Sequence, residues 1–342
     1  MPTPTTPKDP RPETITADDV AEFAGGSRWT VNRAFKQKAS ISTKSRKKVM
    51  AAAEQLGYVP DLLAASLASD KSNLVALLVD DFSNPHKLVM LERLTRILRK
   101  NGWDTLLVNT LDENDTSSAL LNASQRRVDA AVLIGIQYND KVLAAALGAR
   151  RVRKLIVFAR YSENPDTISI CCDDQAAIST VADYVMQKGY QRPFFLAGPQ
   201  TSSAHLMRKE TFLNRWYQEY GVKPSSASVP VYDQRLAFDV VSKHFAGFNR
   251  ADLPDVIVCE NDALALGTVD AIKYSLGLRV PEDIAVTGFD DVPQADSPHY
   301  LLTTYRQPIT AMAEGLVKVL KSHGELEDLR KFSGELVVRN SA

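Results

Sequence analysis

The chain has 342 residues, and its 41 basic and 41 acidic side chains give a formal net charge of zero. Hydrophobic content of 44% with 24% charged residues is ordinary for a globular protein, and the length predicts two or three domains. No apolar run approaches the roughly 20 residues that cross a bilayer, and the N-terminus lacks the regions of a signal peptide, so a cytoplasmic location is expected. The three cysteines and five histidines show no metal-binding spacing or disulfide framework, so no metal and no cofactor is expected.

The N-terminal part of the chain has two sections. Residues 1–13 are rich in proline and threonine and are expected to be disordered. Residues 14–60 are expected to form a three-helix unit, because small apolar residues recur at helical spacing on both sides of Gly25 and Gly26. The two glycines permit a sharp reversal of the backbone, and Ser27 can cap the helix that follows.

The second of these helices carries a polar, aromatic and cationic outer face. Its outward residues are Arg28, Trp29, Asn32 and Arg33. Between Glu22 and Glu54 no residue is acidic and eight are basic, which favours phosphate neutralisation. Such a helix, held at an angle by a tight turn, fits a DNA major groove, so the segment is interpreted as a helix-turn-helix. The turn alone leaves open a small helical hairpin with a solvated face.

Residues 61–72 are predicted to be a hinge helix and linker. The helix-prone stretch from residue 61 to 68 is too short to be stable alone in water, so it should fold only when docked. An ordinary linker turn is the alternative.

From residue 73 the pattern changes to buried strands alternating with helices. Residues 74–79 are continuously apolar, as in a parallel strand covered on both faces. Further strands are predicted at 104–108, 130–134, 155–158, 193–196, 256–259 and 284–288. The alternation predicts an α/β fold of doubly wound parallel sheets, and the two sets of strands, 74–158 and 193–288, predict two similar lobes.

Polar residues follow the carboxyl ends of these strands, where open α/β sheets bind ligands. These stretches are 81–86, 135–137, 159–160, 198–199 leading to Arg208, 260–262 and 289–291. Aromatic, amide, guanidinium and carboxylate groups together suit a small polar or polyhydroxylated molecule. Taken singly each signal is weak, because an aspartate after a strand, such as Asp262, more often caps the next helix.

An ordered set of motifs resembles the lactose-repressor family of bacterial transcriptional regulators over residues 14–340. The motifs are Ala17–Ser27 with Thr30–Arg33, Leu56–Pro60, Ser83–Pro85, Leu196–Pro199, Asn261–Gly267, Val280–Ile284, Gly288–Asp291 and Leu302–Thr304. The resemblance implies a helix-turn-helix DNA-binding headpiece at 14–60, a hinge helix at 61–72, and a two-lobed effector-binding and dimerisation domain at 73–342 that is similar to periplasmic sugar-binding proteins. It also implies a homodimer that binds a near-palindromic double-stranded DNA operator, and a sugar, sugar acid or related metabolite as effector.

The resemblance also assigns site residues by position. It implies that Arg28, Trp29 and Arg33 contact bases, that Ser27, Thr30 and Asn32 support them or hold phosphates, and that Leu67 wedges into the minor groove. The implied effector contacts are Arg208, Asn261 and Asp290, with Phe82 and His86 from the loop after the first strand and an aromatic position at Tyr232 or Gln234.

Three departures from the family pattern bear on specificity. Gly26 stands where an apolar residue is usual, Trp29 is larger than the usual residue, and Ala159 replaces a common aspartate that binds ligand hydroxyls. Arg208 with His86 therefore raises the hypothesis of an anionic ligand. A solute receptor or an α/β enzyme using paired aspartates are the alternative functions, although no nucleotide or nucleophile motif supports an enzyme. The sequence leaves open the sign of regulation and whether dimers pair into tetramers.

Overall fold

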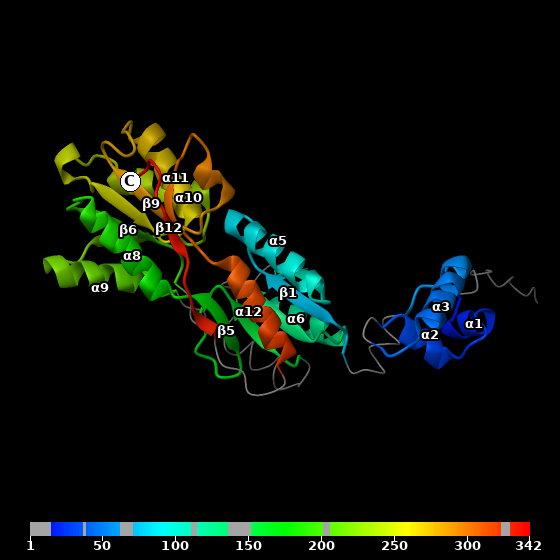
Figure 1. The fold of residues 1–342 in the computed structure, drawn as a ribbon. Coiled ribbons are helices and arrows are strands. Elements are labelled where there is room, and N and C mark those ends of the chain that lie inside the picture. The colour runs from blue at the N-terminus through cyan, green and yellow to red at the C-terminus, as the bar shows by residue number, and fades with distance from the viewer. Residues whose placement is uncertain are drawn as a thin grey trace, which may run out of the picture. The chain divides into compact units, whose positions relative to one another are not determined.

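The structure is a computed structural model that describes residues 15–36, 39–61, 71–110, 115–135, 152–200, 206–322 and 329–342. The chain divides into two units, residues 1–72 and 73–342 (Figure 1). The expected disordered extension, and the central part of the expected hinge helix with Leu67, lie outside the described residues.

The first unit contains three short helices, and local capping explains their boundaries. They are α1 (Ala17–Phe23), α2 (Arg28–Ala34) and α3 (Thr43–Leu56). The side chains of Thr16, Ser27 and Ser42 each accept a hydrogen bond from a backbone N–H of the first turn of their helix. Gly25 turns the chain between α1 and α2 with φ +57°, a left-handed conformation that favours glycine, and Gly57 ends α3 in the same way.

A small apolar core holds the three helices together. The buried residues are Ala17, Val20, Ala21, Ala24, Val31, Ala34, Val49, Ala52 and Ala53. Most of these side chains are alanine, so the helices approach one another closely and each turn of α1 and α2 buries little area. Phe35 and Tyr58 pack edge-on at the border of this core, with ring centroids 5.7 Å apart. The predicted three-helix unit and its turn are confirmed.

The first lobe of the second unit is a six-stranded sheet in the order β11-β5-β4-β3-β1-β2, and its described strand pairs are parallel. Its strands are β1 (Leu74–Val79), β2 (Asp104–Asn109), β3 (Ala130–Ile134), β4 (Leu155–Phe158), β5 (Ile168–Cys172) and β11 (Leu329–Phe332). Alternate residues of β1 pack on α5 (Pro85–Lys100) with α12 (Ile309–Lys321), or on α6 (Asp115–Gln125) on the other face. The sheet is therefore covered on both sides, as its continuous apolar runs predict.

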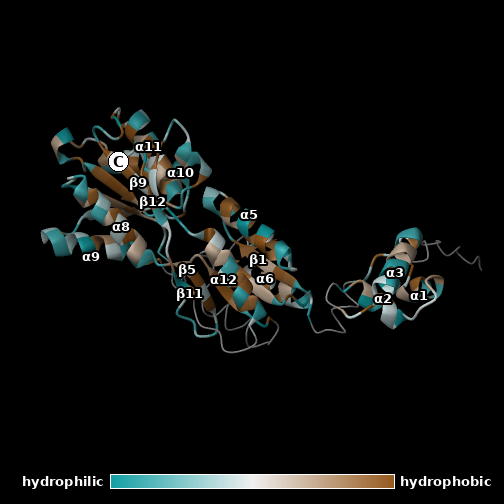
Figure 2. Cartoon of the chain, in the orientation of Figure 1, coloured by the Kyte–Doolittle hydropathy of each residue, from teal (hydrophilic) through white to brown (hydrophobic). Residues whose placement is uncertain are grey.

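The second lobe repeats this plan in the order β12-β10-β9-β8-β6-β7. Its strands are β6 (Pro193–Ala197), β7 (Ser225–Ser228), β8 (Val256–Cys259), β9 (Ala285–Phe289), β10 (Thr303–Arg306) and the antiparallel β12 (Glu335–Val337). Helices α8 (Asp174–Gln187) and α9 (Arg208–Tyr220) cover one face, and α10 (Gln234–Phe245) with α11 (Asp262–Asp270) covers the other. Short helical turns lie at Arg250–Asp252, Ala271–Ser275 and Pro293–Asp296. Figure 2 shows the strands of both lobes as predominantly hydrophobic.

The chain passes between the lobes three times. It leaves the first lobe after β5, returns to it between β10 and α12, and leaves it again between β11 and β12 (Figure 1). The first and third crossings lie side by side, because the backbone N–H of Asp173 donates to the carbonyl of Phe332 at 3.0 Å. The sequence predicts two lobes but assigns neither α12 nor β11 to the first one, since both follow the second lobe in the chain.

The predicted doubly wound α/β architecture is confirmed. The three cysteines are buried, as expected, and burial raises the pKa of each thiol to about 12. In the described part of the chain no helix is long and apolar enough to span a membrane, and no cluster of three or more potential metal ligands occurs.

Candidate functional site

Helix α2 presents an exposed face on the first unit. Ser27, Arg28, Trp29 and Asn32 are exposed, whereas Thr30 and Arg33 are half-buried. The indole of Trp29 is 65% exposed, so it is accessible to a partner from solvent. Arg28 forms an ion pair of 3.1 Å with Asp18 on α1, and both side chains are more than 60% exposed. The outward residues that the sequence predicts do share one face.

One basic residue of this unit has a structural role. Arg46 on α3 donates from its guanidinium to the carbonyl of Ala34, the last residue of α2, and to the carbonyls of Lys36 and Ala39 beyond that helix. The carbonyl of Ala34 is one of the acceptors that a helix leaves unsatisfied at its C-terminus. Arg46 therefore ties Lys36 and Ala39 to the end of α2, and its guanidinium is engaged within the unit although the sequence counts it among the cations for phosphate.

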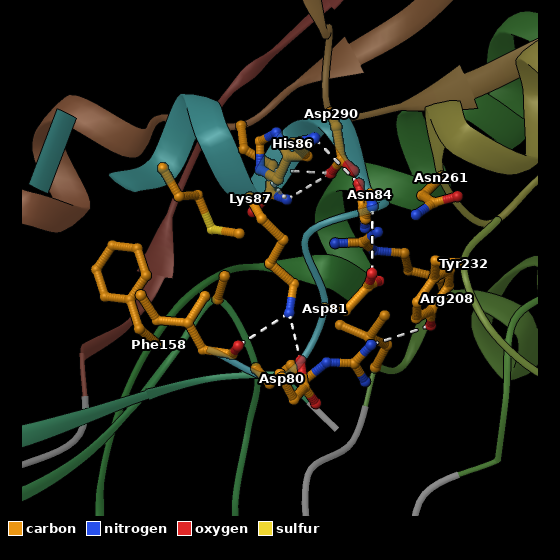
Figure 3. A pocket seen from close by; sticks show the side chains of 17 residues that line it. Asp80, Asp81, Asn84, His86, Lys87, Phe158, Arg208, Tyr232, Asn261 and Asp290 are labelled. Carbon is orange, nitrogen blue, oxygen red and sulfur yellow. Dashed lines mark hydrogen bonds and ion pairs between the residues drawn. The ribbon is translucent and has the colours of Figure 1, made fainter. Parts of the chain in front are cut away.

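The second unit contains a pocket between its two lobes, at the carboxyl ends of both sheets (Figure 3). It encloses about 500 Å³, including its opening to solvent. The first lobe contributes Asp80, Asp81, Asn84, His86, Lys87, Met90, Ile134, Gly135, Phe158, Ala159 and Arg160, and the second Leu206, Arg208, Tyr232, Asn261, Asp290 and Gln307. The pocket thus lies beyond the carboxyl ends of the parallel strands of both lobes, where the sequence predicts ligand-binding residues.

Arg208 is the most firmly held cation of the pocket. Its side chain is only 3% exposed, its Nε donates to Oδ1 of Asp174 at 2.9 Å, and its Nη1 donates to the carbonyl of Glu260 at 2.9 Å. The guanidinium also lies 3.6 Å from the centroid of the Phe289 ring. Burial opposes its charge, but Asp174 and Asp290 outweigh burial and raise the pKa of Arg208 above its ordinary value. The side chain is therefore charged and fixed before any ligand arrives.

A chain of hydrogen bonds crosses between the lobes at Tyr232. Arg160 of the first lobe donates from Nη2 to the Tyr232 hydroxyl at 3.0 Å, and that hydroxyl donates to Oε2 of Glu260 at 2.9 Å. Oε2 also accepts from the backbone N–H of Gly198 at 2.6 Å. Burial, together with the charge of Glu260, raises the pKa of Tyr232, so the phenol keeps its proton and remains the donor to Glu260.

A second cavity lies beyond this chain and shares Arg160, Leu206 and Tyr232 with the first pocket. It encloses about 940 Å³, including open solvent. Polar side chains of both lobes line it, among them Glu163, Lys209 and Ser228. The space between the lobes therefore consists of a narrow inner pocket and a wider outer one.

The positive charge of Lys87 is balanced by an ion pair within the inner pocket. Its Nζ donates to Oδ1 of Asp80 at 2.8 Å and to the carbonyl of Ile134 at 2.9 Å, and both side chains are almost fully buried. Burial lowers the pKa of Lys87, while Asp80 acts against that shift. Gly135 permits this pairing, because a Cβ at residue 135 would lie 2.0 Å from the Asp80 carboxylate.

Gln307 connects the two lobes through Asp290 and His86. Its amide Nε2 donates to Oδ1 of Asp290 at 2.7 Å and lies 3.3 Å from Nε2 of His86. Burial, with the charges of Arg208 and Lys87, lowers the pKa of His86 to about 3, so this imidazole is neutral. Because the amide nitrogen can only donate, Nε2 of the neutral His86 ring accepts, and the ring proton is on Nδ1, which is buried and has no partner among the described residues.

Asp290 occupies an unusual backbone conformation at the end of β9. Its φ is +127°, and Ala159, at the end of β4 in the other lobe, has φ +60°. Non-glycine residues adopt such angles at a cost of about 1–3 kcal/mol and do so mainly at functional sites. Burial raises the pKa of the Asp290 carboxyl to about 7, although Arg208 and Gln307 act against the shift. The two strained residues lie on opposite walls of one pocket.

Asp262 is a second buried carboxyl, and its pKa predicts a pH-dependent stability. Thr304 donates to Oδ1 at 2.6 Å and the backbone N–H of Val292 donates to Oδ2 at 2.9 Å. Burial, followed by the charge of Asp290, raises its pKa to about 7, above the unfolded value of about 3.9. The stability that this proton contributes is present in full below about pH 4 and is lost as the pH rises through about 7.

We therefore expect Asp262→Asn to gain stability relative to the wild type as the pH increases. The difference in unfolding free energy between the two should grow by roughly 1–4 kcal/mol from pH 5 to pH 8, since one pKa unit corresponds to about 1.4 kcal/mol. Urea unfolding followed by the fluorescence of the buried Trp216 measures it. Asp239→Asn, which removes an exposed carboxylate from the same lobe, should show a constant difference. A constant difference for Asp262→Asn would contradict the assignment.

The residues predicted to contact an effector divide into two groups. His86, Arg208, Asn261, Asp290 and Tyr232 all line the inner pocket. Phe82 is 37% exposed and is not among the lining residues, and Gln234 instead bonds to Asp270 and Tyr300 outside the pocket. Of the two alternatives for the aromatic position, Tyr232 lines the pocket and Gln234 does not.

Sequence reasoning missed several polar residues of the pocket. Asp80 and Lys87 flank stretches that it did select, and Gln307 follows β10, a strand that it did not predict. The β-branched and aromatic residues Thr303, Thr304 and Tyr305 are the signal that could have predicted this strand, and with it Gln307 at its carboxyl end.

Models of two protein families match the chain. Residues 16–61 match the model described as bacterial regulatory proteins of the lacI family, and residues 182–341 match a periplasmic binding protein-like domain. Among curated relatives, the probable HTH-type transcriptional repressor ExuR of Bacillus subtilis is 26% identical over 92% of this chain and 93% of its own length. The sucrose operon repressor of Escherichia coli is 25% identical over 80% and 83%. These relatives are regulators rather than enzymes.

Solved structures show the same fold. The lac repressor bound to ONPG in the repressed state matches with a TM-score of 0.79 at 22% identity, covering 96% of this chain and all of its own. The lac repressor dimer bound to operator and the anti-inducer ONPF also has a TM-score of 0.79, at 23% identity, with coverages of 96% and 99%. A transcriptional regulator CelR–cellobiose complex has a TM-score of 0.69 at 22% identity, covering 96% of this chain and all of its own.

Proposed function

The chain belongs to the lacI family of bacterial regulatory proteins, and from this premise we propose that it is a ligand-responsive transcriptional repressor that binds a near-palindromic DNA operator as a homodimer. The observation that carries the proposal is the presence in one chain of an exposed, cationic helix-turn-helix face and a polar pocket between two lobes. A solute receptor would not require the helix-turn-helix face. The relatives named as repressors support the combination.

The exposed face of α2 serves as the DNA-reading surface in this proposal. Arg28 and Arg33 supply guanidinium groups, which can read guanine in the major groove, and Ser27, Thr30 and Asn32 supply groups that can hold phosphates. The 7-residue length of α2 suits insertion of one or two turns into a groove.

The pocket chemistry supports a neutral carbohydrate as the effector. Arg208 is paired with Asp174 and Lys87 with Asp80, while His86 is neutral, so these groups offer no uncompensated positive charge to a carboxylate ligand. Asp290 can accept from ligand hydroxyls, and Asn261 uses its Oδ1 to cap α11, which leaves its Nδ2 as a donor. The paired charges favour sugars over the sugar acids that the sequence also suggests.

The outer cavity supports a ligand of more than one ring. Arg160, Leu206 and Tyr232 line both cavities, so in this proposal one sugar occupies the inner pocket and a second lies beyond Tyr232 in the outer cavity. The relatives named for sucrose and the neighbour bound to cellobiose are consistent with a disaccharide.

Regulation follows from lobe closure in this proposal. A ligand that contacts Arg160 in the first lobe and Arg208 in the second binds the closed arrangement best, and closure alters the geometry of the paired headpieces. The coupling is reciprocal, so DNA and effector change each other's affinity by the same factor, typically 5- to 150-fold.

The test begins with selection of bound fragments from genomic DNA by the purified full-length chain at moderate salt. The proposal predicts recovery of a near-palindrome, whose affinity is then measured with and without glucose, sucrose, cellobiose and glucuronate. At least one neutral sugar should shift operator affinity 5-fold or more, and glucuronate should not. Binding that is sensitive to salt but blind to sequence in every condition, or an operator affinity that no ligand changes, would refute the regulatory role.

A further inference from the structure

The indole of Trp29 and the guanidinium of Arg33 form a stacked pair on α2. The central carbon of the guanidinium lies 4.4 Å from the centroid of the indole ring. The two residues are four positions apart, so they lie on the same face of the helix, and a cation over the face of tryptophan is attracted by the ring quadrupole. Trp29 is 65% exposed and belongs to no apolar core, so packing within the unit does not explain its presence.

A backbone carbonyl fixes the same guanidinium from another side. Arg33 donates from Nε to the carbonyl of Ser40 at 2.9 Å. Ser40 follows Ala39, whose carbonyl accepts from Nη2 of Arg46 at 3.2 Å, as does the carbonyl of Lys36 at 3.1 Å. The stack orients the plane of the guanidinium and the Nε bond restricts its rotation. Its two terminal nitrogens, with four N–H groups, have no partner among the described residues.

Arg28 differs in each of these respects. Its terminal nitrogen is engaged with Asp18, its side chain is 64% exposed, and no described aromatic ring stacks on it. Arg28 must break or weaken its ion pair with Asp18 before its guanidinium contacts a base. Of the two arginines on the reading face, only Arg33 is oriented with its bidentate fork unoccupied.

We propose that Trp29 is a positioning residue for Arg33: the indole holds the guanidinium in the orientation that reads guanine, so base choice at one position of each half-site depends on Trp29 through Arg33. The inference rests on the proposed DNA-binding function. Ordering the long arginine side chain before binding removes the loss of rotamer freedom that would otherwise accompany recognition, and it disfavours geometries suited to other bases.

The experiment measures base preference in the full-length chain with four variants. Wild type, Trp29→Ala, Trp29→Phe, Arg33→Ala and the Trp29→Ala/Arg33→Ala double variant each select from a duplex library randomised over the half-site. We expect the wild type to prefer guanine at one position by about 5- to 150-fold, the discrimination of one bidentate contact. Arg33→Ala should abolish this preference, and Trp29→Ala should reduce it at least 5-fold at the same position.

Two comparisons separate positioning from other roles. Trp29→Phe keeps a ring for stacking and should retain most of the preference, whereas the double variant should match Arg33→Ala at every position. Trp29→Ala and Trp29→Phe should unfold at the wild-type temperature, because Trp29 lies outside the core. Salt-dependent binding to non-specific duplex should be unchanged by Trp29→Ala.

Several results would overturn the inference. Loss of preference at a different base pair would show that Trp29 reads its own base, and uniformly weaker binding with the preference intact would show a contact without positioning. A wild-type chain that enriches a near-palindrome while Trp29→Ala leaves every preference unaltered refutes this inference alone. A wild-type chain that enriches no sequence refutes the proposed function, and the inference with it.

Discussion

Replacing Arg208 with methionine is expected to weaken effector binding more than 100-fold. The guanidinium is buried, holds Asp174 and the Glu260 carbonyl, and stacks on Phe289. Methionine fills similar space but donates no hydrogen bond, and hydrogen bonds to charged groups contribute about 1.5–3 kcal/mol each. The change also leaves Asp174 and Asp290 without their main counter-charge, which costs more than the lost ligand contact. Calorimetric titration with the sugar that wild type binds most tightly measures the loss.

Arg215→Met is the matched control for this prediction. Arg215 lies on the same helix α9, but its side chain is 31% exposed and its partners, Asp183 and Glu219, are surface carboxylates. Its removal should change effector affinity less than 2-fold, because exposed ion pairs contribute little. Arg208→Lys, which keeps the charge without the fork, should lie between Arg208→Met and the wild type. Wild-type affinity in Arg208→Met would exclude this guanidinium from the binding site.

Gly198→Ala is expected to weaken effector binding about 10- to 100-fold through Tyr232. A Cβ at residue 198 would lie 2.1 Å from Cε1 of the Tyr232 ring and 2.7 Å from Oε2 of Glu260. Since no side chain tolerates such a contact, the ring must move, and its hydroxyl then loses both Arg160 and Glu260. Overpacking of this kind costs about 1–3 kcal/mol, and the wall shared by the inner and outer cavities is displaced.

Tyr232→Phe shows how much of this effect belongs to the hydroxyl. It keeps the ring in place and removes one buried hydroxyl, so the loss of affinity should be smaller, about 2- to 12-fold for a net contribution of 0.5–1.5 kcal/mol. Both losses are measured by titration with the same sugar. If Gly198→Ala bound that sugar as tightly as wild type, the position of Tyr232 would be irrelevant to recognition.

Local rules account for much of this fold. The apolar run at 74–79 predicts a strand covered on both faces, and β1 alternates between α5 with α12 and α6 as expected. The paired glycines and Ser27 predict the turn into α2 because they act on neighbouring backbone. The carboxyl-end rule finds both walls of the pocket because it depends only on strand direction.

Other features depend on contacts between distant segments, and no local pattern contains them. Arg208 meets Asp174 only because β5 leads into the second lobe, and Gln307 reaches His86 only because the chain crosses back after β10. The choice of Tyr232 over Gln234 depends on which way a loop turns. The pairing of Lys87 with Asp80 requires a glycine at position 135, directly after the neighbouring strand β3. Charge counting likewise assigns Arg46 to phosphate, whereas in the structure its guanidinium donates to backbone carbonyls at and beyond the end of α2.

The three crossings also constrain the order in which a ribosome can complete this unit. The first lobe begins at β1 but needs α12 and β11, which are synthesised after all the parallel strands of the second lobe. The second lobe in turn needs Ser341, whose hydroxyl donates to the carbonyl of Val286 at 2.6 Å and accepts from the N–H of Thr303. A nascent chain released at residue 300 therefore holds two unfinished sheets, each exposing apolar strands. The stretch of chain from α12 to Ser341 therefore supplies the final elements of both lobes, so the two sheets are completed together rather than one after the other.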